Sequence, residues 1–306
     1  MKTTMNSNYH QPPFVNELIF FAECAKQGVV FDLFGGDATY GEVLLGAYED
    51  LDYYYFDLDK TAVETAEDRL DKYKNRVHIK RLNCRYLENR IHDEGIDGID
   101  LAIYDPGLRR EYVDNPKRGF VIRQDGPLDG RYDQSSGETI AQVIQDYSEE
   151  ELIEIFHTAD VPFAGRVAEF IVENRQQKSI TSTTQLSDIA FRATPPKARR
   201  KKIPPGVLVM LALRMHVNGE LECLKEALEK GFSALNKNGV LFTISYHSGE
   251  ARIFKSFAKE LDERYADDNK KRLRVLTRKA IKPTEDAIRE NPLIRSAQLR
   301  VYEKLS

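Results

Sequence analysis

Four short apolar segments, separated by stretches of helical pattern, constrain this chain most. They are "GVVFDLFGG" (28–36), "DYYYFDLD" (52–59), "RVHIKRLN" (76–83) and "GIDLAIYDPG" (98–107). Each has the length and composition of a buried strand and ends in polar or turn-forming residues. Strands that alternate with helices predict a parallel sheet that helices cover on both faces. We therefore expect an α/β fold with a Rossmann-like, doubly wound sheet.

A purely helical pattern interrupts this alternation in the middle of the chain. Apolar residues at helical spacing run through 148–159, 163–177 and 179–193. Ser148 and Glu151 have the spacing of a capping box at the start of the first of these helices. This pattern predicts an inserted helical domain.

Strand patterns return near the end of the chain. They cover 238–247, which opens with the turn signal Asn238-Gly239, and then 270–278 and 296–305. The two patterns together predict one discontinuous α/β domain and one all-helical insert. The predicted boundaries are 1–107 and 208–306 for the α/β domain, and 108–207 for the insert.

Composition and charge exclude several classes of protein. A net charge of −4 over 306 residues rules out a global basic field, so any nucleic-acid site must be a local patch. Cys24, Cys84 and Cys223 have neither metal-ligand nor redox spacing, so we expect no metal and a reducing compartment. The chain has neither an apolar run of the ~18 residues that span a membrane nor the apolar core of a signal peptide near residue 1. We expect a cytoplasmic protein with no membrane contact.

The turn after the first predicted strand, "DLFGGDATYGE", has the composition of a cofactor-binding loop. Gly35 and Gly36 let the backbone approach a ligand closely, and Asp32 and Asp37 flank them. Asp57 lies about twenty residues further on, where a carboxylate can bind ribose hydroxyls. The motif is not GxGxxG, which favours S-adenosylmethionine over a nicotinamide cofactor. A tight turn without a ligand is the alternative.

Two further points about this region stay open. A helical pattern follows the turn from Glu42 to Leu51. Asp57 and Asp59 lie on the same face of the second predicted strand, because side chains alternate along a strand. Spacing alone therefore does not say which of these two carboxylates binds the ribose.

The end of the fourth predicted strand, "IYDPG", favours amine methylation. An exocyclic base amine has its lone pair delocalised into the ring. Two acceptors that bind its N–H groups turn the lone pair toward a methyl donor. Asp105 supplies a carboxylate for this role, and Pro106 stiffens the turn because its ring fixes φ. An ordinary Asp-Pro turn is the alternative.

Longer motifs then carry a resemblance to a known family. They are "RGF" (118–120) with "DGPLDGRYD" (125–133), "TSTTQLSDI" (181–189), "ALRMHVNGEL" (212–221), "ISYHSGEARIFK" (244–255) and "NPLIRSAQLRVYEK" (291–304). In order and spacing the chain resembles the ribosomal RNA small subunit methyltransferase H family, from Tyr9 to Lys304. The resemblance implies a Rossmann-like domain with a helical insert that methylates the N4 amine of a cytosine in 16S ribosomal RNA. Its cofactor is S-adenosylmethionine.

The resemblance also assigns roles to single residues. It implies that Asp105 and Pro106 are catalytic, and that Asp32, Gly35, Gly36, Asp37, Asp57 and Asp105 bind the cofactor. It implies substrate contacts by Asp125, Asp129 and Arg131. The residues themselves add three further candidates for substrate contacts: Arg109 and Arg110 form a local basic rim just after Asp105, and His247 lies at the end of a predicted strand. For Arg118 and Asp133 the residues alone favour a clamp of Arg–Asp pairs between the two domains. The basic run "KARRKK" (197–202) is a candidate for phosphate contacts.

Several positions differ from the family pattern. The glycine-rich motif reads Gly36-Asp37-Ala38-Thr39-Tyr40-Gly41, and two arginines, Arg109 and Arg110, stand where the family has hydroxyls. Two alternatives therefore stay open. One is a non-catalytic RNA-binding or assembly protein with an altered cofactor site. The other is a methyltransferase with a changed substrate. Ribosomal RNA or the small ribosomal subunit is the expected partner, and a homodimer is a further prediction.

Overall fold

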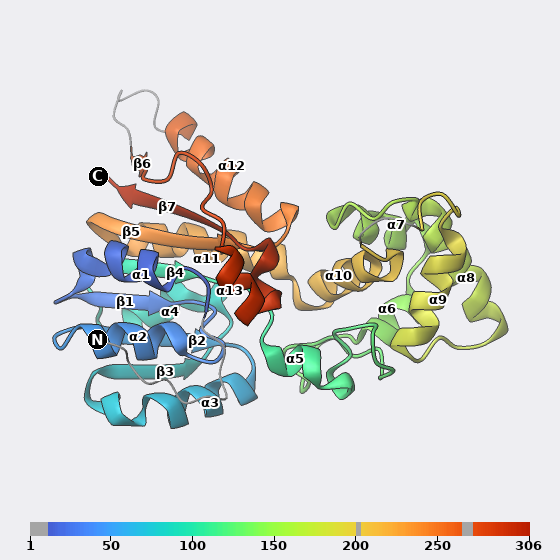
Figure 1. Ribbon diagram of the computed structural model, residues 1–306, viewed down its shortest axis with the longest axis horizontal. Helices are drawn as coiled ribbons and strands as arrows, with labels where there is room; N and C mark the ends of the chain where they lie inside the picture. Colours follow the sequence, from blue (N-terminus) through green and yellow to red (C-terminus); the bar gives the residue numbers. More distant parts are fainter. Residues whose placement is uncertain (1–11, 200–202, 265–271) are drawn as a thin grey trace. The chain divides into compact units, whose positions relative to one another are not determined.

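The computed structural model describes residues 12–199, 203–264 and 272–306 (Figure 1). The chain divides into two compact units. One comprises residues 1–107 and 222–306, and the other comprises residues 108–221. We call them the α/β unit and the helical unit and describe each by itself.

A seven-stranded sheet forms the centre of the α/β unit, in the order β3-β2-β1-β4-β5-β7-β6. The first five of these are parallel neighbours, whereas β7 runs antiparallel to both β5 and β6. Strand order reverses between β1 and β4, which is the switch point of a doubly wound sheet. The predicted fold class is confirmed. The strands are β1 Val29–Asp32, β2 Asp52–Asp57, β3 Val77–Arg81, β4 Ile99–Tyr104, β5 Leu235–Ser245, β6 Leu273–Val275 and β7 Gln298–Lys304.

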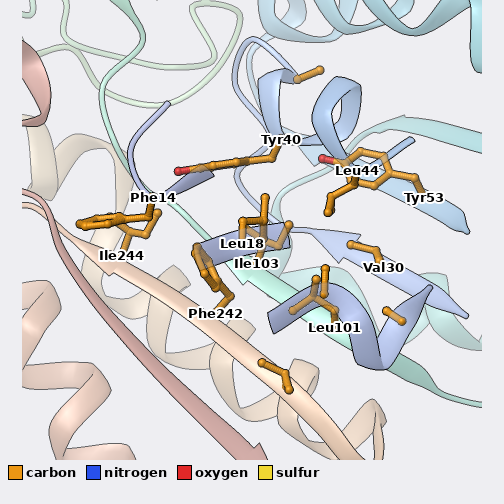
Figure 2. Close-up of a cluster of buried hydrophobic side chains, with 14 of the residues drawn as sticks. Phe14, Leu18, Val30, Tyr40, Leu44, Tyr53, Leu101, Ile103, Phe242 and Ile244 are labelled. Atoms are coloured by element: carbon orange, nitrogen blue, oxygen red, sulfur yellow. The ribbon is translucent and has the colours of Figure 1, made fainter. Parts of the chain in front are cut away.

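Helices cover both faces of this sheet because each central strand is apolar on both faces. Val30 packs with α1 and α2 in one core cluster (Figure 2), while its neighbour Phe31 packs with α11 and α12 in the other. The α-helices of this unit are α1 Val15–Phe21, α2 Thr39–Ala47, α3 Lys60–Leu70, α4 Leu87–Asp93, α11 Glu220–Ala234, α12 Ser248–Arg264 and α13 Glu285–Glu290. Its 3-10 helices are η1 Ala22–Ala25, η2 Asp71–Arg76, η3 Cys84–Tyr86 and η6 Pro292–Ser296.

Two local predictions in this unit are wrong in detail. The helix expected over 42–51 is α2, which starts earlier because Ala38 adopts a left-handed conformation just before it (φ 55°), and which ends before the extended Tyr48. The turn expected at Asn238-Gly239 lies inside β5. Asn238 has φ 66°, and the pairing with β4 jumps from Leu235 to Val240 across it. The Asn-Gly pair correctly indicated a turn-like backbone conformation at Asn238, but β5 continues through it.

The helical unit packs its helices around one core. They are α5 Arg110–Asp114, η4 Pro116–Arg118, α6 Ile140–Asp146, α7 Glu149–Thr158, α8 Ala164–Gln177, α9 Thr183–Ala193 and α10 Pro205–Asn218. The predicted capping box of Ser148 and Glu151 is present at α7, and equivalent boxes start α6 and α9. Each box satisfies N–H groups that the first helical turn leaves without partners.

The end of the helical unit lies beyond its predicted boundary. Val209, Met210 and Leu213 of α10 are buried in the core that α7, α8 and α9 share. The division therefore falls between Leu221 and Glu222, not after residue 207. Within the described ranges, none of the helices combines the length and the apolarity needed to span a bilayer.

Candidate functional site

Three carboxylates gather at one edge of the sheet in the α/β unit. Asp32 is the last residue of β1, and it pairs with Tyr55 on β2 and with Ile103 on β4. Asp57 and Asp105 each lie two residues beyond those partners, at the carboxyl ends of the same neighbouring strands. We call Asp32, Asp57 and Asp105 the strand-end acids. They flank the switch point, where ligands of doubly wound sheets bind.

The glycine turn after β1 is fixed onto β2. The Gly36 amide donates to Asp57 Oδ2 at 3.0 Å, and the Tyr55 hydroxyl donates to the Gly36 carbonyl oxygen at 2.7 Å. Gly36 has φ 51°, which favours glycine. A Cβ on Gly35 would lie 2.1 Å from the Tyr55 ring, so close packing excludes a side chain there. Asp37 follows in the same turn and is half-buried.

The structure separates the roles of Asp57 and Asp59. Asp59 is buried and caps α3, because its Oδ1 accepts from the amide and the hydroxyl of Thr61 at 2.8 and 3.0 Å. Asp57 is half-buried and joins the glycine turn, and its Oδ1 accepts from the Asp59 amide at 2.8 Å. Two backbone amides thus hold the Asp57 carboxylate in one orientation. Of the two candidates, Asp57 has the geometry of a ligand-binding group.

Asp32 is fully buried and incompletely hydrogen-bonded. Its Oδ2 accepts from the Tyr53 hydroxyl at 2.5 Å, whereas its Oδ1 has no hydrogen-bond partner in the described part of the chain. Burial raises the pKa of Asp32 to about 7. The Tyr53 hydrogen bond lowers this pKa, and the charges of Asp105 and Asp57 raise it further. Asp32 therefore takes up a proton near neutral pH.

Asp105 is half-buried at the start of a tight turn. Its Oδ1 accepts from the Gly107 amide at 3.2 Å, so Pro106 lies at the centre of an Asx-type turn. Burial raises the pKa of Asp105 to about 6, although the hydroxyls of Tyr246 and Tyr40 and the Gly107 amide lower it. Glu250 is close enough for its charge to raise this pKa. No arginine or lysine is therefore among the groups that shift the pKa of Asp105.

His247 has a structural role that its sequence position did not indicate. It directly precedes α12, and its Nδ1 accepts from the Gly249 amide at 3.2 Å. Glu250, which is buried, accepts from the amides of Tyr246 and His247 at 2.6 and 3.3 Å. The His247 Nε2 lies 3.1 Å from Glu250 Oε1. This arrangement resembles a capping box, with His247 in the place of serine.

Three residues near the strand-end acids were missed by sequence reasoning. They are Tyr53, Tyr246 and Glu250. Tyrosines in strands are usual core residues, so Tyr53 and Tyr246 gave no signal. Glu250 did have one, because a glutamate three residues after a helix N-cap is typical of a capping box. Tyr40, which follows the glycine turn, is buried (Figure 2), and its hydroxyl donates to the Pro13 carbonyl oxygen at 2.9 Å.

In the helical unit, Arg118 organises the loop from Arg118 to Asp133. Its guanidinium is buried and lies 4.7 Å from the centroid of the Tyr112 ring. It donates to Glu111 Oε2 at 3.2 Å and to the carbonyl oxygens of Arg131 and Tyr132 at 3.2 and 3.1 Å. These partners all belong to the helical unit. Arg118 therefore acts as a clamp within that unit.

The acids of this loop also have local partners. Asp129 receives two hydrogen bonds from the Arg131 guanidinium, at 3.0 and 2.8 Å. Burial raises the pKa of Asp129, but the hydrogen bonds and charge of Arg131 hold it below its usual value. Asp125 accepts from the Thr184 hydroxyl at 2.5 Å, which lowers its pKa. Asp133 accepts from the amide and the hydroxyl of Ser135.

The two arginines after the Asp-Pro turn differ in exposure. Arg109 is largely buried, and its guanidinium lies 5.5 Å from the centroid of the Tyr112 ring. Arg110 is exposed and pairs with Asp114 at 2.8 Å.

The structure groups Asp32, Gly35, Gly36, Asp57 and Asp105 at one sheet edge. Arg109, Arg110, Asp125, Asp129 and Arg131 belong to the helical unit.

A doubly wound sheet with a glycine turn and acids at its switch point defines an α/β protein that binds a nucleoside-containing ligand. The chain belongs to the MraW methylase family, whose model matches residues 7–305. The predicted family, enzyme class and cofactor are confirmed: this is an S-adenosylmethionine-dependent methyltransferase.

Curated relatives match over nearly their whole length. Ribosomal RNA small subunit methyltransferase H of Halothermothrix orenii is 33% identical, over 97% of this chain and 98% of its own. The protein of the same name from Sulfurihydrogenibium azorense is 34% identical, over 97% and 99%. The solved structure of an rRNA methylase from Streptococcus thermophilus aligns over 96% of this chain and 98% of its own, at 13% identity and a TM-score of 0.46.

Proposed function

We propose that this protein transfers a methyl group from S-adenosylmethionine to the N4 amine of a cytosine in 16S ribosomal RNA. The relatives' shared name supports the class of substrate. Asp105 supports the chemistry, because it is a half-buried carboxylate at the switch point of the sheet. This position of Asp105, beside Asp32 and Asp57, is the observation on which the proposal depends.

The residues at the sheet edge fit this cofactor. S-adenosylmethionine carries a positive sulfonium and an ammonium, which complement the three strand-end acids. Asp57, held by the amides of Gly36 and Asp59, would accept hydrogen bonds from the ribose hydroxyls. The buried and unpaired Oδ1 of Asp32 would receive a donor from the bound molecule. Gly35, Gly36 and Asp37 would place backbone beside it.

Asp105 and Pro106 would orient the target amine. S-adenosylmethionine supplies an electrophilic methyl carbon bound to a sulfonium. The Asp105 carboxylate and the Pro106 carbonyl oxygen would accept the two N–H groups, which turns the nitrogen lone pair toward that carbon. Bond formation from this nitrogen to the methyl carbon would release the C–S electron pair to sulfur. Asp105 or water would then take the proton that the nitrogen loses.

The remaining predicted substrate contacts stay proposals. Arg110 is an exposed cation, so it suits a phosphate contact. Arg109, Asp125, Asp129, Arg131 and His247 already have structural partners and would contact RNA only through groups that these leave open. In "KARRKK", residues 200–202 lie outside the described residues. We also propose a cytoplasmic location, and a homodimer stays a prediction.

Methyl transfer to small ribosomal subunits tests the proposed function. The acceptor would be 30S subunits from a deletion strain, and the donor would carry a tritiated methyl group. Nuclease digestion and mass spectrometry should find one N4-methylated cytosine in 16S RNA. Asp105→Ala should lose the product, and the exposed Asp68→Asn should retain it. Incorporation into another RNA or into protein, with none into 16S RNA, would contradict the proposed substrate.

A further inference from the structure

A cavity on the helical unit has none of the predicted site residues in its lining. It has a volume of about 470 Å³ and lies between the C-terminal half of α8, the following loop and α9. Its lining includes Asn174, Gln177, Lys178, Asp188, Phe191 and Arg192. The two helices lie side by side in Figure 1. We call this feature the α8–α9 groove. Its volume is in the range of small-ligand sites.

Phe191 gives the groove an exposed aromatic ring that is held beside a cation. The side chain is 47% exposed although it lies on a helix with a buried apolar face. The Arg199 guanidinium lies 4.5 Å from the centroid of its ring. Arg199 is fixed there because it donates to the carbonyl oxygens of Thr194 and Arg192, at 2.7 and 3.1 Å. An exposed ring beside a fixed guanidinium is a platform on which a base can stack.

The cations of this region are not neutralised. Lys178, Arg192, Lys197 and Arg199 form no ion pair with any carboxylate in the described ranges. Arg192 instead donates to the amide oxygen of Asn174 at 2.9 Å. The acid in the groove lining is Asp188. Elsewhere in the same unit the buried arginines Arg118 and Arg214 are each paired with a glutamate.

We propose that the α8–α9 groove binds an unpaired nucleotide of the RNA substrate. A base would stack on Phe191, while Lys178, Arg192 and Arg199 would contact the flanking phosphates. The side-chain amide of Gln177 can donate to and accept from a base edge. The occupant is single-stranded, because only an unstacked base presents its face to an aromatic side chain. This inference rests on the proposed function for the identity of the RNA.

Charge favours an anionic occupant such as RNA. The whole chain carries a net charge of −4, whereas Lys178, Arg192 and Arg199 bring three positive charges to this groove. Exposed aromatic side chains within a basic groove are typical of single-strand binding surfaces. An acidic peptide would match the charges, and the polyglutamate arm of the test below distinguishes it from RNA.

The test measures RNA binding by the full chain without methyl transfer. Fluorescence anisotropy would follow a labelled single-stranded RNA of about ten nucleotides. Phe191→Ala should weaken binding about five- to hundredfold. Lys178→Gln and Arg199→Gln should each lower the slope of log affinity against log salt concentration by about 0.7. Thermal melting would show that the variants fold, and Lys178→Gln leaves the α9 carbonyls untouched.

Two matched controls come from the same chain. Arg166 is an exposed arginine 5.6 Å from the centroid of the Phe170 ring on α8, outside the groove lining. Arg166→Gln should keep both affinity and salt slope. Phe20 is 74% exposed on α1 of the α/β unit, and Phe20→Ala should bind RNA as the unchanged protein does.

Three results would overturn this inference. In the first, Phe191→Ala and Arg199→Gln bind RNA as tightly as the unchanged protein. In the second, Arg166→Gln loses as much affinity as Arg199→Gln, which indicates non-specific charge. In the third, polyglutamate binds with the same dependence on Phe191, which indicates an acidic protein partner. If instead RNA binding depends on Phe191 but 16S RNA receives no methyl group, the proposed function fails and the groove assignment stands.

Discussion

The two units use their aspartates in opposite ways. In the α/β unit, burial raises the pKa of Asp32 to about 7 and that of Asp105 to about 6. In the helical unit, local hydrogen bonds lower the pKa of Asp125 and of Asp129, which also pairs with Arg131. Both groups lie in turns rich in glycine, and both were predicted to contribute to the site.

The difference separates binding chemistry from structural chemistry. Asp129 and Arg131 neutralise one another, so they stabilise a loop and attract little else. Asp32 and Asp105 have no comparable cation among the interactions that shift their pKa values, so a bound sulfonium and ammonium would supply positive charge beside them. The account therefore predicts that substitutions in the loop change stability, whereas substitutions at the sheet edge change binding and activity.

The largest expected effect is the loss of the Arg118 clamp. Arg118→Ala should lower the free energy of unfolding by about 3–5 kcal/mol, because it leaves Glu111 and two carbonyl oxygens without their donor. Urea denaturation would measure this. Arg110→Ala is the control, because its pair with Asp114 is exposed and should contribute less than about 1 kcal/mol. Equal effects of the two substitutions would show that the clamp does not hold the loop.

Asp105 and Asp129 should differ in their effect on methyl transfer. Asp105→Asn should lower the single-turnover rate about a hundredfold, because the amide replaces one acceptor with a donor at the target amine. Asp129→Asn should lower this rate less than about tenfold once the variant is shown to be folded. Similar losses at the two positions would break the distinction between the units.

The pKa of Asp105 should also appear in the pH profile. Its ionised form accepts the amine hydrogens, so kcat/KM should be constant well above pH 6 and fall as pH drops through about 6. Each further pH unit should cost about tenfold. A profile that stays level down to pH 5 would contradict this role for the carboxylate.

Asp32 should lower stability at neutral and higher pH. Folding raises the pKa of Asp32, so the unfolded chain loses this proton at a lower pH than the native state does. Its contribution to stability is therefore full below about pH 4 and is lost as pH rises through about 7. Asp32→Asn should stabilise the protein at pH 8 by about 2 kcal/mol, because the amide cannot ionise. This gain is roughly half the linkage value for a three-unit pKa shift, since the amide also weakens the Tyr53 hydrogen bond. Thermal melting at pH 5 and pH 8 should show this gain only at pH 8.

The smallest effect concerns the cap of α3. Asp59→Ala should lower stability by about 1 kcal/mol, the usual value of an N-cap, and leave the affinity for S-adenosylmethionine unchanged. A loss of affinity comparable to that of Asp57→Ala would show that the two carboxylates act together.

The sequence predicted the sheet edge better than its surroundings. Asp32, Asp57 and Asp105 were recognisable because each directly follows an apolar run, and parallel strands bring such ends together. The interactions of Tyr246 and Glu250 with Asp105 were not recognisable, because they join the end of β4 to residues more than a hundred positions away, just after β5 and in α12. The boundary at α10 was missed for a different reason. A helix has the same apolar period whichever core it packs against, so its pattern does not tell the two units apart.

Calorimetric titration of S-adenosylmethionine into the purified protein, Asp57→Ala and Asp129→Ala tests directly whether the strand-end acids bind the cofactor. We expect micromolar binding by the unchanged protein, which corresponds to about −8 kcal/mol. Asp57→Ala should weaken it at least about tenfold, and Asp129→Ala should leave it unchanged. Binding that survives Asp57→Ala, or that is lost equally in Asp129→Ala, would contradict the assignment of the cofactor to the strand-end acids.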